Sequence, residues 1–583
     1  MHLRATCSAT VASFVLAACA PAAPISTPRP GTATGDAARV AALADEFVRA
    51  YMAAAPEEAE QWGVPLERHD ALTDNSLQGV RAWQAREDAW AAELGRIDGT
   101  ALRGRPEWVT YGMLRERIEA SRAARVCRTE LWPVNQMSGW QVNFATLAAL
   151  QPVGTPSLRE QALARWRRIP AYLRNEEANL REGVRLGYTT PRRNVELVIE
   201  QLDALRDMPV EESPFFSPAL RDSTPGFRDA WAALLRDEVM PAVARYRDYL
   251  AAEYLPAARE SLGVGALPDG RACYQAMFRL NTTLDRAPEE TYALGQARVA
   301  RNQAEVVEIG RHAFGTADVD SIRARLRTGG FASRDEMLAF ANDAVQRARA
   351  AVPRAFRTTP GAPIVIQPHP GFLEATASDQ YFPAAEDGSR PAEYRINLGK
   401  SATTTRAQAE ITAFHETYPG HHLQIGTAQQ AAGADLVARL ISSGSYVEGW
   451  ARYAEALAEE LGLYTSDEAR VSRRLWPARG MVLDPGIHLF GWTRQQAVDY
   501  IASSGRMGAQ GADALVDRVV AWPGQLTAYD TGALEFFALR ELAERELGPR
   551  FDLREFHDVV LRNGAVTLPM LREAVEAWIA ERR

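Results

Sequence analysis

Residues His415 to His422 read HETYPGHH. This stretch holds three of the nine histidines of the chain, and a glutamate directly follows the first of them. In the common H-E-x-x-H arrangement, two histidines four positions apart on one helix reach the same zinc ion, and the glutamate points at the metal-bound water. The cluster therefore predicts a zinc site with His415 as a ligand and Glu416 as the general base.

The spacing departs from that arrangement because Pro419 occupies the position of the second histidine. On an unbroken helix, His421 and His422 would lie about 9 to 10 Å along the axis from His415, at about 1.5 Å per residue. That is too far for two ligands that each lie about 2.0 Å from one ion. Proline cannot donate to the helix and Gly420 tolerates unusual backbone angles, so we expect the helix to break here. Once it breaks, helical geometry no longer decides between His421 and His422.

Outward from this stretch, the chain is mostly helical in pattern, with apolar residues recurring every three or four positions. The clearest predicted helices are Ala37–Ala54, Gln78–Leu94, Arg159–Leu186, Asp229–Tyr254, Glu289–Phe314 and Arg334–Ala351. Two short segments, Pro363–Gln367 and Glu393–Leu398, have strand-like patterns and predict a small sheet ahead of the histidine helix. This sheet is either a structural hairpin or an edge that pairs with an extended peptide. The predicted fold class is mainly α, with a small β-sheet beside the active-site helix.

The N-terminus has the pattern of an export signal. Arg4 is followed by an apolar segment, Ala5 to Ala18, that is too short to span a bilayer. Its end, Leu-Ala-Ala before Cys19, resembles a bacterial lipobox, which predicts a signal peptide at residues 1–18 and lipidation of Cys19. An ordinary signal peptide cut near Ala-x-Ala is the alternative, and both place the protein in the periplasm or cell envelope. Residues 20–35 are predicted to be a flexible tether, and residues 36–583 one large catalytic domain with one or two lobes.

Composition excludes several functions. The formal net charge is -8 and the sequence pI about 5.8, so there is no overall basic field to bind nucleic acid. Lys400 is the only lysine, which argues against pyridoxal chemistry, and Tyr394 stands where a P-loop ending at Gly399-Lys400-Ser401 would need its first glycine. Export leaves Cys127 and Cys273 in a compartment that permits disulfides, where they form either one bridge or two buried thiols.

HETYPGHH also resembles the H-E-x-x-P-G-H motif of a large bacterial family of unknown function. That family is regarded as zinc peptidases distantly similar to angiotensin-converting-enzyme-like and Taq-carboxypeptidase-like peptidases, so the resemblance implies a zincin-like fold. The histidine after Pro-Gly is the expected ligand in the family, which favours His421. Val447–Glu455 is similar to its second motif, E-G-W-x-x-Y-x-E, and implies Glu448 as the third zinc ligand. Glu455 could orient a ligand histidine, although a charged helix face with internal pairs is the alternative.

Two further segments are similar to the same family. Leu483–Arg494 resembles its D-x-G-x-H...G-W stretch, and Arg518–Tyr529 resembles R-Y-x-x-x-P-G-Q-x-x-x-Y, with Val519 where a tyrosine is usual. In similar peptidases a histidine and a tyrosine stabilise the oxyanion, which points to His488 and Tyr529. For Tyr529, packing as an ordinary aromatic is an equal alternative.

A zinc ion on the three ligands would lower the pKa of bound water toward about 7, and Glu416 would accept the proton of that water. Arg518, Arg494 and Gln525 are candidates to bind the carboxylate of a peptide C-terminus, with surface ion pairs as the alternative for the arginines. Tyr394 is a further candidate for substrate contact.

The predicted function is that of an exported zinc metallopeptidase that hydrolyses short peptides in a carboxypeptidase-like manner. The alternatives are a zinc amidohydrolase acting on a non-peptide amide, and a non-catalytic lipoprotein that binds zinc. The expected partners are a short peptide and the membrane, the latter through a lipid anchor only, and no nucleic acid is expected.

Overall fold

The computed structural model describes residues 35–583 except for residues 62–65, 327–328, 370–373, 375–377, 386–387, 389, 431–436 and 438–440. The predicted signal peptide, Cys19 and the tether up to residue 34 lie outside the described residues, and the first helix begins at Gly35. The described chain divides into two compact units. The larger unit comprises residues 103–120 and 271–583, and the smaller unit comprises residues 35–102 and 121–270.

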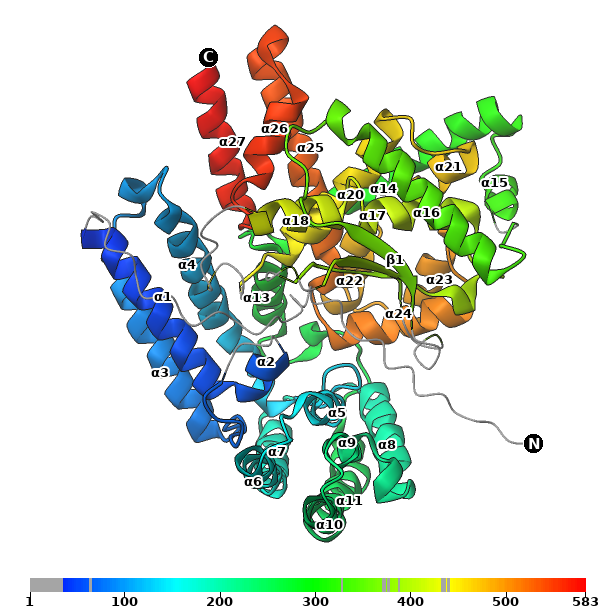
Figure 1. Ribbon diagram of the computed structural model, residues 1–583. Helices are drawn as coiled ribbons and strands as arrows, with labels where there is room; N and C mark the ends of the chain where they lie inside the picture. The colour runs from blue at the N-terminus through cyan, green and yellow to red at the C-terminus, as the bar shows by residue number, and fades with distance from the viewer. Residues whose placement is uncertain are drawn as a thin grey trace. The chain divides into compact units, whose positions relative to one another are not determined.

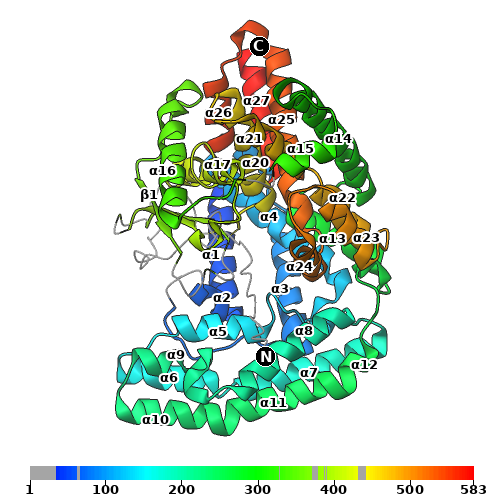
Figure 2. The same ribbon diagram turned by 90° about the vertical axis from the view of Figure 1, so that its right-hand side faces the viewer.

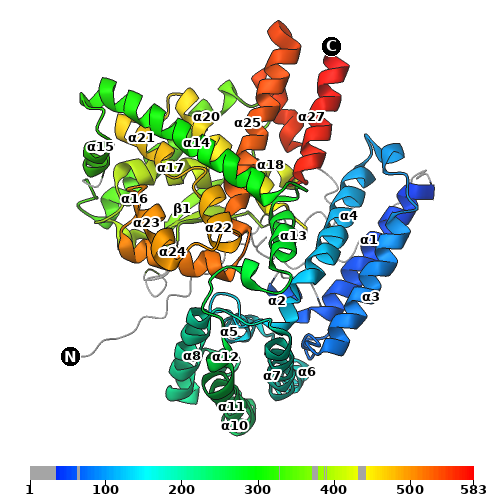
Figure 3. The ribbon, with the colours of Figure 1, turned by 180° about the vertical axis from the view of Figure 1, so that it is seen from behind.

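The larger unit contains a small sheet surrounded by helices (Figure 1). Its elements are α4 (Pro106–Ala124), α13 (Gly270–Thr282), α14 (Pro288–Ile309), α15 (Val319–Leu326), α16 (Arg334–Ala351), β1 (Ile364–Pro368), β2 (Gln380–Phe382), β3 (Ala392–Ile396), α17 (Arg406–Glu416), α18 (His421–Gln430), α20 (Gly444–Glu460), α21 (Asp467–Leu475), α22 (Gly480–His488), α23 (Arg494–Ala502), α24 (Ala509–Ala521), α25 (Ala528–Leu547), α26 (Leu553–Leu561) and α27 (Leu568–Arg582). Helices α25 and α27 pack side by side (Figure 3).

The smaller unit is built of helices, and its described residues form no β-strand. The helices are α1 (Gly35–Ala54), α2 (Pro56–Gln61), α3 (Leu77–Leu94), α5 (Trp140–Leu150), α6 (Pro156–Trp166), α7 (Ile169–Leu186), α8 (Arg192–Asp207), α9 (Ser217–Arg221), α10 (Pro225–Leu234), α11 (Met240–Tyr249) and α12 (Leu255–Ala257). Aromatic side chains fill its core, where Trp166 packs edge-on against Phe215 and in a tilted arrangement against Trp231.

The mainly α fold class is confirmed, and the predicted long helices are present with three differences. The helix predicted at Glu289–Phe314 is α-helical to Ile309 and ends in a π-turn at Gly310–Phe314. Residues 225–257 form one continuous helical run in which π-turns occupy Leu235–Val239 and Leu250–Tyr254 (Figure 2). The predicted helix Arg159–Leu186 is two helices, because α6 ends at Trp166 and α7 begins at Ile169. Pro170 lies in the first turn of α7, where its missing N–H costs no helical hydrogen bond.

The small sheet has three strands in the order β1-β3-β2. Both predicted strands exist, and of the two alternatives for this sheet the hairpin of these two strands is wrong, because β1 and β3 run parallel. A parallel pair needs a long connection, and residues 369–391 supply it. That connection also contains β2, which pairs antiparallel with β3 and was missed in the sequence because it is only three residues long.

The sheet and the histidine helix share one hydrophobic core. Tyr394 and Ile396 of β3 are fully buried in it together with Phe414 of α17 and Trp450 of α20. Helix α16 packs on both β1 and α17 (Figure 1). The strands and helices that carry the candidate site are therefore held by a common apolar interior.

Among the described residues, no helix is both long enough and apolar enough to cross a membrane. Cys127 and Cys273 are both disulfide-bonded, which decides between the bridge and the two buried thiols left open by the sequence.

The buried carboxyl group of Glu176 on α7 predicts a pH-dependent stability. Burial raises the pKa of Glu176 from 4.5 to about 7, while the Tyr246 hydroxyl donates to it over 2.5 Å and opposes the shift. Because the pKa is higher in the folded state, protonated Glu176 adds to the free energy of unfolding. This stabilisation is complete below about pH 4.5 and is lost as the pH rises through about 7. The loss should amount to roughly 3 kcal/mol.

Glu176→Gln keeps a neutral acceptor for Tyr246 and should remove this dependence. In thermal unfolding between pH 5 and pH 8, the Tm of the variant should rise relative to the Tm of the wild type as the pH increases. Glu200→Gln, at an exposed position on α8, is the matched control and should follow the wild type. Parallel curves for Glu176→Gln and wild type would contradict the prediction.

Candidate metal centre

The helix break predicted at Pro419 is present, and it reverses the chain. Helix α17 begins with a capping box at Thr405 and ends at Glu416, and α18 begins at His421. The amide of Gly420 donates back to the carbonyl of Phe414 over 3.1 Å. A Cβ atom on Gly420 would lie 1.9 Å from the carbonyl oxygen of His415, so only glycine fits this close approach.

The reversal brings the imidazoles of His415 and His421 together. Their ring centroids are 4.8 Å apart and the ring planes are nearly perpendicular, at 88°. His422 lies on another side of α18, where its Nδ1 is 3.2 Å from the Tyr381 hydroxyl and its ring packs edge-on against Tyr418. The structure thus pairs His421, and not His422, with the first histidine.

Helix α20 adds the third donor, and each residue of its Glu-Gly-Trp sequence has a distinct role. Glu448 faces the two histidines. Gly449 lets α25 approach closely, because a Cβ atom there would lie 2.5 Å from the backbone of Gly532. The indole Nε1 of Trp450 donates to the carbonyl of Pro419 over 3.0 Å, which ties α20 to the chain reversal.

The three candidate ligands are arranged as a cation site requires. Glu448 Oε2 lies 3.5 Å from His415 Nε2 and 3.8 Å from His421 Nε2, and one ligand atom from each residue falls within 4.8 Å of the others. Ligand atoms placed tetrahedrally at about 2.0 to 2.1 Å from a zinc ion would lie about 3.3 Å apart. Two imidazoles and one carboxylate also match the donor set of catalytic zinc sites, so the residues present fit the ion.

A second layer of hydrogen bonds orients His415. Its Nδ1 is 2.9 Å from Glu455 Oε1, which leaves Nε2 directed at Glu448. Arg452 Nη1 donates to the same Glu455 oxygen over 2.8 Å. Burial opposes the charged form of Glu455, but Arg452 and His415 outweigh it and lower the pKa of the carboxyl to about 2. Glu455 is therefore a fixed anion behind His415, the first candidate ligand.

Glu416 is held beside the three donors by the short strand β2. The backbone amide of Tyr381 donates to Glu416 Oε2 over 2.9 Å. Burial raises the pKa of Glu416 to about 8; the charge of His415 opposes the shift, and the negative charges of Glu448 and Asp379 reinforce it. The side chain that follows His415 is thus a buried carboxyl group with a fixed orientation.

The family of the chain follows from a match over most of its length. The family model described as "Bacterial protein of unknown function (DUF885)" matches residues 56–575. The chain belongs to this DUF885 family. No curated protein is significantly similar to it.

Two solved structures resemble this DUF885 protein. One is a predicted lipoprotein from Colwellia psychrerythraea, with a TM-score of 0.82 and 24% sequence identity over 94% of this chain and 99% of the other. The second is a predicted lipoprotein of unknown function from Shewanella oneidensis, with a TM-score of 0.77 and 19% identity over 92% of this chain and 99% of the other. At these identities the likeness shows a shared fold.

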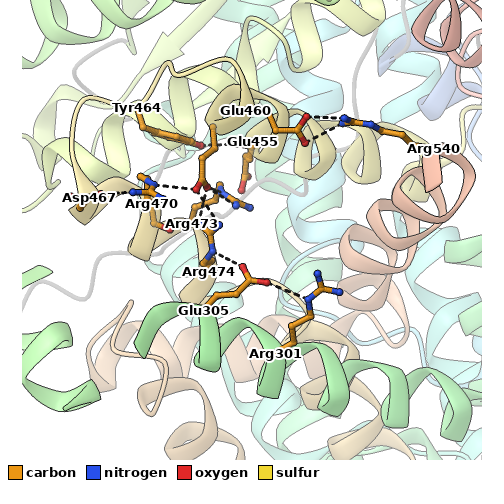
Figure 4. Close-up of polar contacts among 11 residues, drawn as sticks. Arg301, Glu305, Glu455, Glu460, Tyr464, Asp467, Arg470, Arg473, Arg474 and Arg540 are labelled. Atoms are coloured by element: carbon orange, nitrogen blue, oxygen red, sulfur yellow. Dashed lines mark hydrogen bonds and ion pairs between the residues drawn. The ribbon is translucent and has the colours of Figure 1, made fainter. Parts of the chain in front are cut away.

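In this DUF885 protein a cluster of arginines secures the C-terminal end of α20 (Figure 4). Arg470, Arg473 and Arg474 of α21 all donate to Glu459, and Arg474 also donates to Glu305 of α14. Burial opposes ionisation of Glu459, but these guanidinium groups lower its pKa to about 2. The cluster fixes α21 and α14 on the helix that carries Glu448 and Glu455.

Two segments that sequence similarity singled out also meet. Asp484 accepts hydrogen bonds from the amide of Gly524 over 2.9 Å and from the Tyr274 hydroxyl over 2.7 Å. Arg518 Nη2 donates to Gln525 Oε1 over 3.1 Å and to the Tyr529 hydroxyl over 3.4 Å. The structure therefore brings Arg518, Gln525 and Tyr529 together, as the sequence suggested.

Three other predicted site residues are engaged elsewhere. His488 is stacked on Tyr274, and its Nε2 is 2.9 Å from the carbonyl oxygen of Val519. The guanidinium of Arg494 pairs with Asp513 and Asp517 on α24, both at 2.7 Å. Tyr394 is fully buried, and its hydroxyl donates to Asp379 over 3.1 Å. The sequence could not reveal these partners, because each is a tertiary or cross-segment contact rather than part of a local pattern.

The residue missed by sequence reasoning is Tyr381, whose amide holds Glu416. A backbone donor has no sequence signature of its own. The only available signal was the apolar pair Tyr381-Phe382 ahead of Pro383, which is too short to identify a strand.

The positions of the two adjacent histidines predict different effects on metal content. His421→Ala should lose zinc, with an affinity at least about 100-fold weaker, because removal of an outer partner alone costs about 10- to 100-fold. His422→Ala should retain it, because its ring faces Tyr381 and Tyr418. Metal analysis after dialysis and titration against a competing chelator would measure this. Both variants open a buried cavity, so each controls for the other, and the opposite order would contradict the assignment.

Proposed function

We propose that this protein is an exported zinc-dependent peptidase. The observation that carries the proposal is the position of Glu416, a buried carboxyl group held by the Tyr381 amide beside two histidines and a glutamate that fit a catalytic zinc ion. A purely structural zinc site is usually closed by four protein ligands. Here three donors come together, which fits a site that leaves a position for water and substrate.

A zinc ion held by His415, His421 and Glu448 supplies Lewis-acid chemistry, lowering the pKa of water and polarising a carbonyl group. Glu416 accepts the proton of the attacking water and transfers it to the nitrogen of the leaving amine. The amide of Tyr381 keeps the carboxyl group of Glu416 turned toward that proton. Glu455 keeps Nε2 of His415 directed at the site.

Tyr529 is suited to stabilise the oxyanion. Its hydroxyl is held by Arg518, and its phenol lies within electrostatic reach of Glu448. Burial raises the pKa of Tyr529, and the charge of Glu448 adds to the shift, so the hydroxyl keeps its proton as a donor. With His488 engaged by Val519, Tyr529 is the better of the two candidates from the sequence.

Export through a lipid anchor is part of the proposal. It rests on the lipobox-like segment that ends at Cys19. The two similar solved structures are both described as predicted lipoproteins, which supports the same location in the cell envelope.

Glu416→Gln tests the mechanism. The variant should retain zinc and lose about 10²- to 10⁴-fold in kcat/KM on short peptides, because amide and carboxylate are similar in size but only the carboxylate accepts a proton. Peptide hydrolysis followed by mass spectrometry, together with metal analysis, would measure both. Glu541→Gln, at an exposed position on α25, is the matched control.

Undiminished turnover in Glu416→Gln would remove Glu416 from the mechanism. Turnover that survives complete removal of metal by a chelator would exclude a metal-dependent reaction. Hydrolysis of a non-peptide amide without hydrolysis of any peptide would make the protein an amidohydrolase.

A further inference from the structure

The hydrogen bonds of Arg518 on α24 go to neutral groups. Its Nη2 donates to the Gln525 amide oxygen and to the Tyr529 hydroxyl. Its Nε is buried without a hydrogen-bond partner, and no carboxylate pairs with it among the described residues. Arg518 is half-buried, and a partly desolvated guanidinium without an anion is unfavourable, so Arg518 is suited to bind an anion that arrives with a ligand.

Neighbouring arginines show how the chain neutralises such charges elsewhere. Arg494, on the adjoining helix, pairs with both Asp513 and Asp517. Arg452 of α20 pairs with Glu455. Both acidic residues of α24 are thus engaged by Arg494, and no carboxylate in the described part of the chain is left to pair with Arg518.

The surroundings hold Arg518 in place. Asp484 accepts from the amides of Gly524 and Leu526, on either side of Gln525, and so fixes the turn that presents the Gln525 side chain. The guanidinium also lies over the ring of Trp522, with its carbon 5.7 Å from the ring centroid. A positioned, planar guanidinium binds a carboxylate through two parallel hydrogen bonds.

Tyr529 connects this charge to the metal centre. Its hydroxyl is 3.4 Å from Arg518 Nη2, and the phenol interacts electrostatically with Glu448. An anion on Arg518 would therefore lie beside Tyr529, whose ring centroid is 5.8 Å from the guanidinium carbon of Arg452, the partner of Glu455. Successive Cα atoms of a peptide are about 3.8 Å apart, so the end of a substrate bound there is close to the scissile bond.

We propose that Arg518, with Gln525 beside it, binds the C-terminal carboxylate of the substrate, so that the enzyme removes residues from the C-terminal end of short peptides. This rests on the proposed peptidase function. In the reaction, water adds its hydroxyl to the carbonyl carbon near that end, the C–N bond breaks, and the proton passes through Glu416 to the released amine. The products are a shortened peptide with a new carboxylate and the C-terminal fragment.

The test compares a blocked peptide that has a free C-terminal carboxylate with the same peptide as its C-terminal amide. Wild-type enzyme should cleave the acid about 10- to 100-fold better in kcat/KM, the range expected for a hydrogen-bonded charged pair. Arg518→Gln should lower this ratio to near one by slowing the acid alone. Arg518→Lys should restore part of it, because it returns the charge without the second hydrogen bond.

Arg494→Gln is the matched comparison. It removes an arginine that is already paired with two aspartates, so the ratio between acid and amide should stay at the wild-type value. Because both peptides are measured on one sample, partial misfolding of a variant cancels in the ratio. Equal cleavage of acid and amide by the wild type, or an equal loss of both in Arg518→Gln, would overturn the proposal.

Binding separates this proposal from the proposed function. Calorimetry with zinc-loaded Glu416→Gln should show the acid binding at least about tenfold more tightly than the amide, and the double variant with Arg518→Gln should bind both equally. Preferential binding of the acid without turnover in the wild type would contradict the proposed peptidase function and support the carboxylate site at Arg518. Turnover with equal binding of acid and amide would support the peptidase function and contradict the carboxylate site.

Discussion

The hydrogen bond from the Trp450 indole to the carbonyl of Pro419 joins the two segments that supply the candidate ligands. One segment reverses direction at Gly420, where the backbone packs so closely on α17 that no side chain fits. The other segment is α20. It carries Glu448 directly before Gly449, the residue at which α20 contacts α25. If this contact moved, Glu448 and His421 would lose their common centre even though each helix stayed intact.

Helix α20 organises the charges around that centre. Glu448 faces the histidines, and Glu455, two turns later, contacts His415. Glu459, one turn further on, accepts hydrogen bonds from the arginines of α21. Burying this many ionised groups is costly, and such pairs are weak evidence for stability. Their arrangement in one place, with the pKa of Glu416 raised and that of Glu455 lowered, is typical of a functional site.

The three-stranded sheet contributes to the same centre through backbone rather than side chains. β3 is buried in the core with α17, and β2 lies at the edge of the sheet, where its Tyr381 amide reaches Glu416. Asp484 plays a comparable role on the opposite segment, since it fixes the turn before Tyr529 by accepting from two amides. In both places a hydrogen bond to main chain decides where a reactive side chain points.

By itself, the sequence determined the helical class, both longer strands, the break at Pro419 and the identity of Glu416 as the candidate base. These follow from local physics, because periodicity, proline and a His-Glu pair act over a few residues. The choice of His421, and of Glu448 as its partner, came from resemblance. Three features came from the tertiary fold: β1 and β3 are parallel, His488 is held by the Val519 carbonyl, and Arg494 is paired with carboxylates while Arg518, among the described residues, is not. Each of these features depends on contacts between distant segments. HETYPGHH forms a candidate metal centre only together with α20, which supplies Glu448 and contacts Pro419 through Trp450.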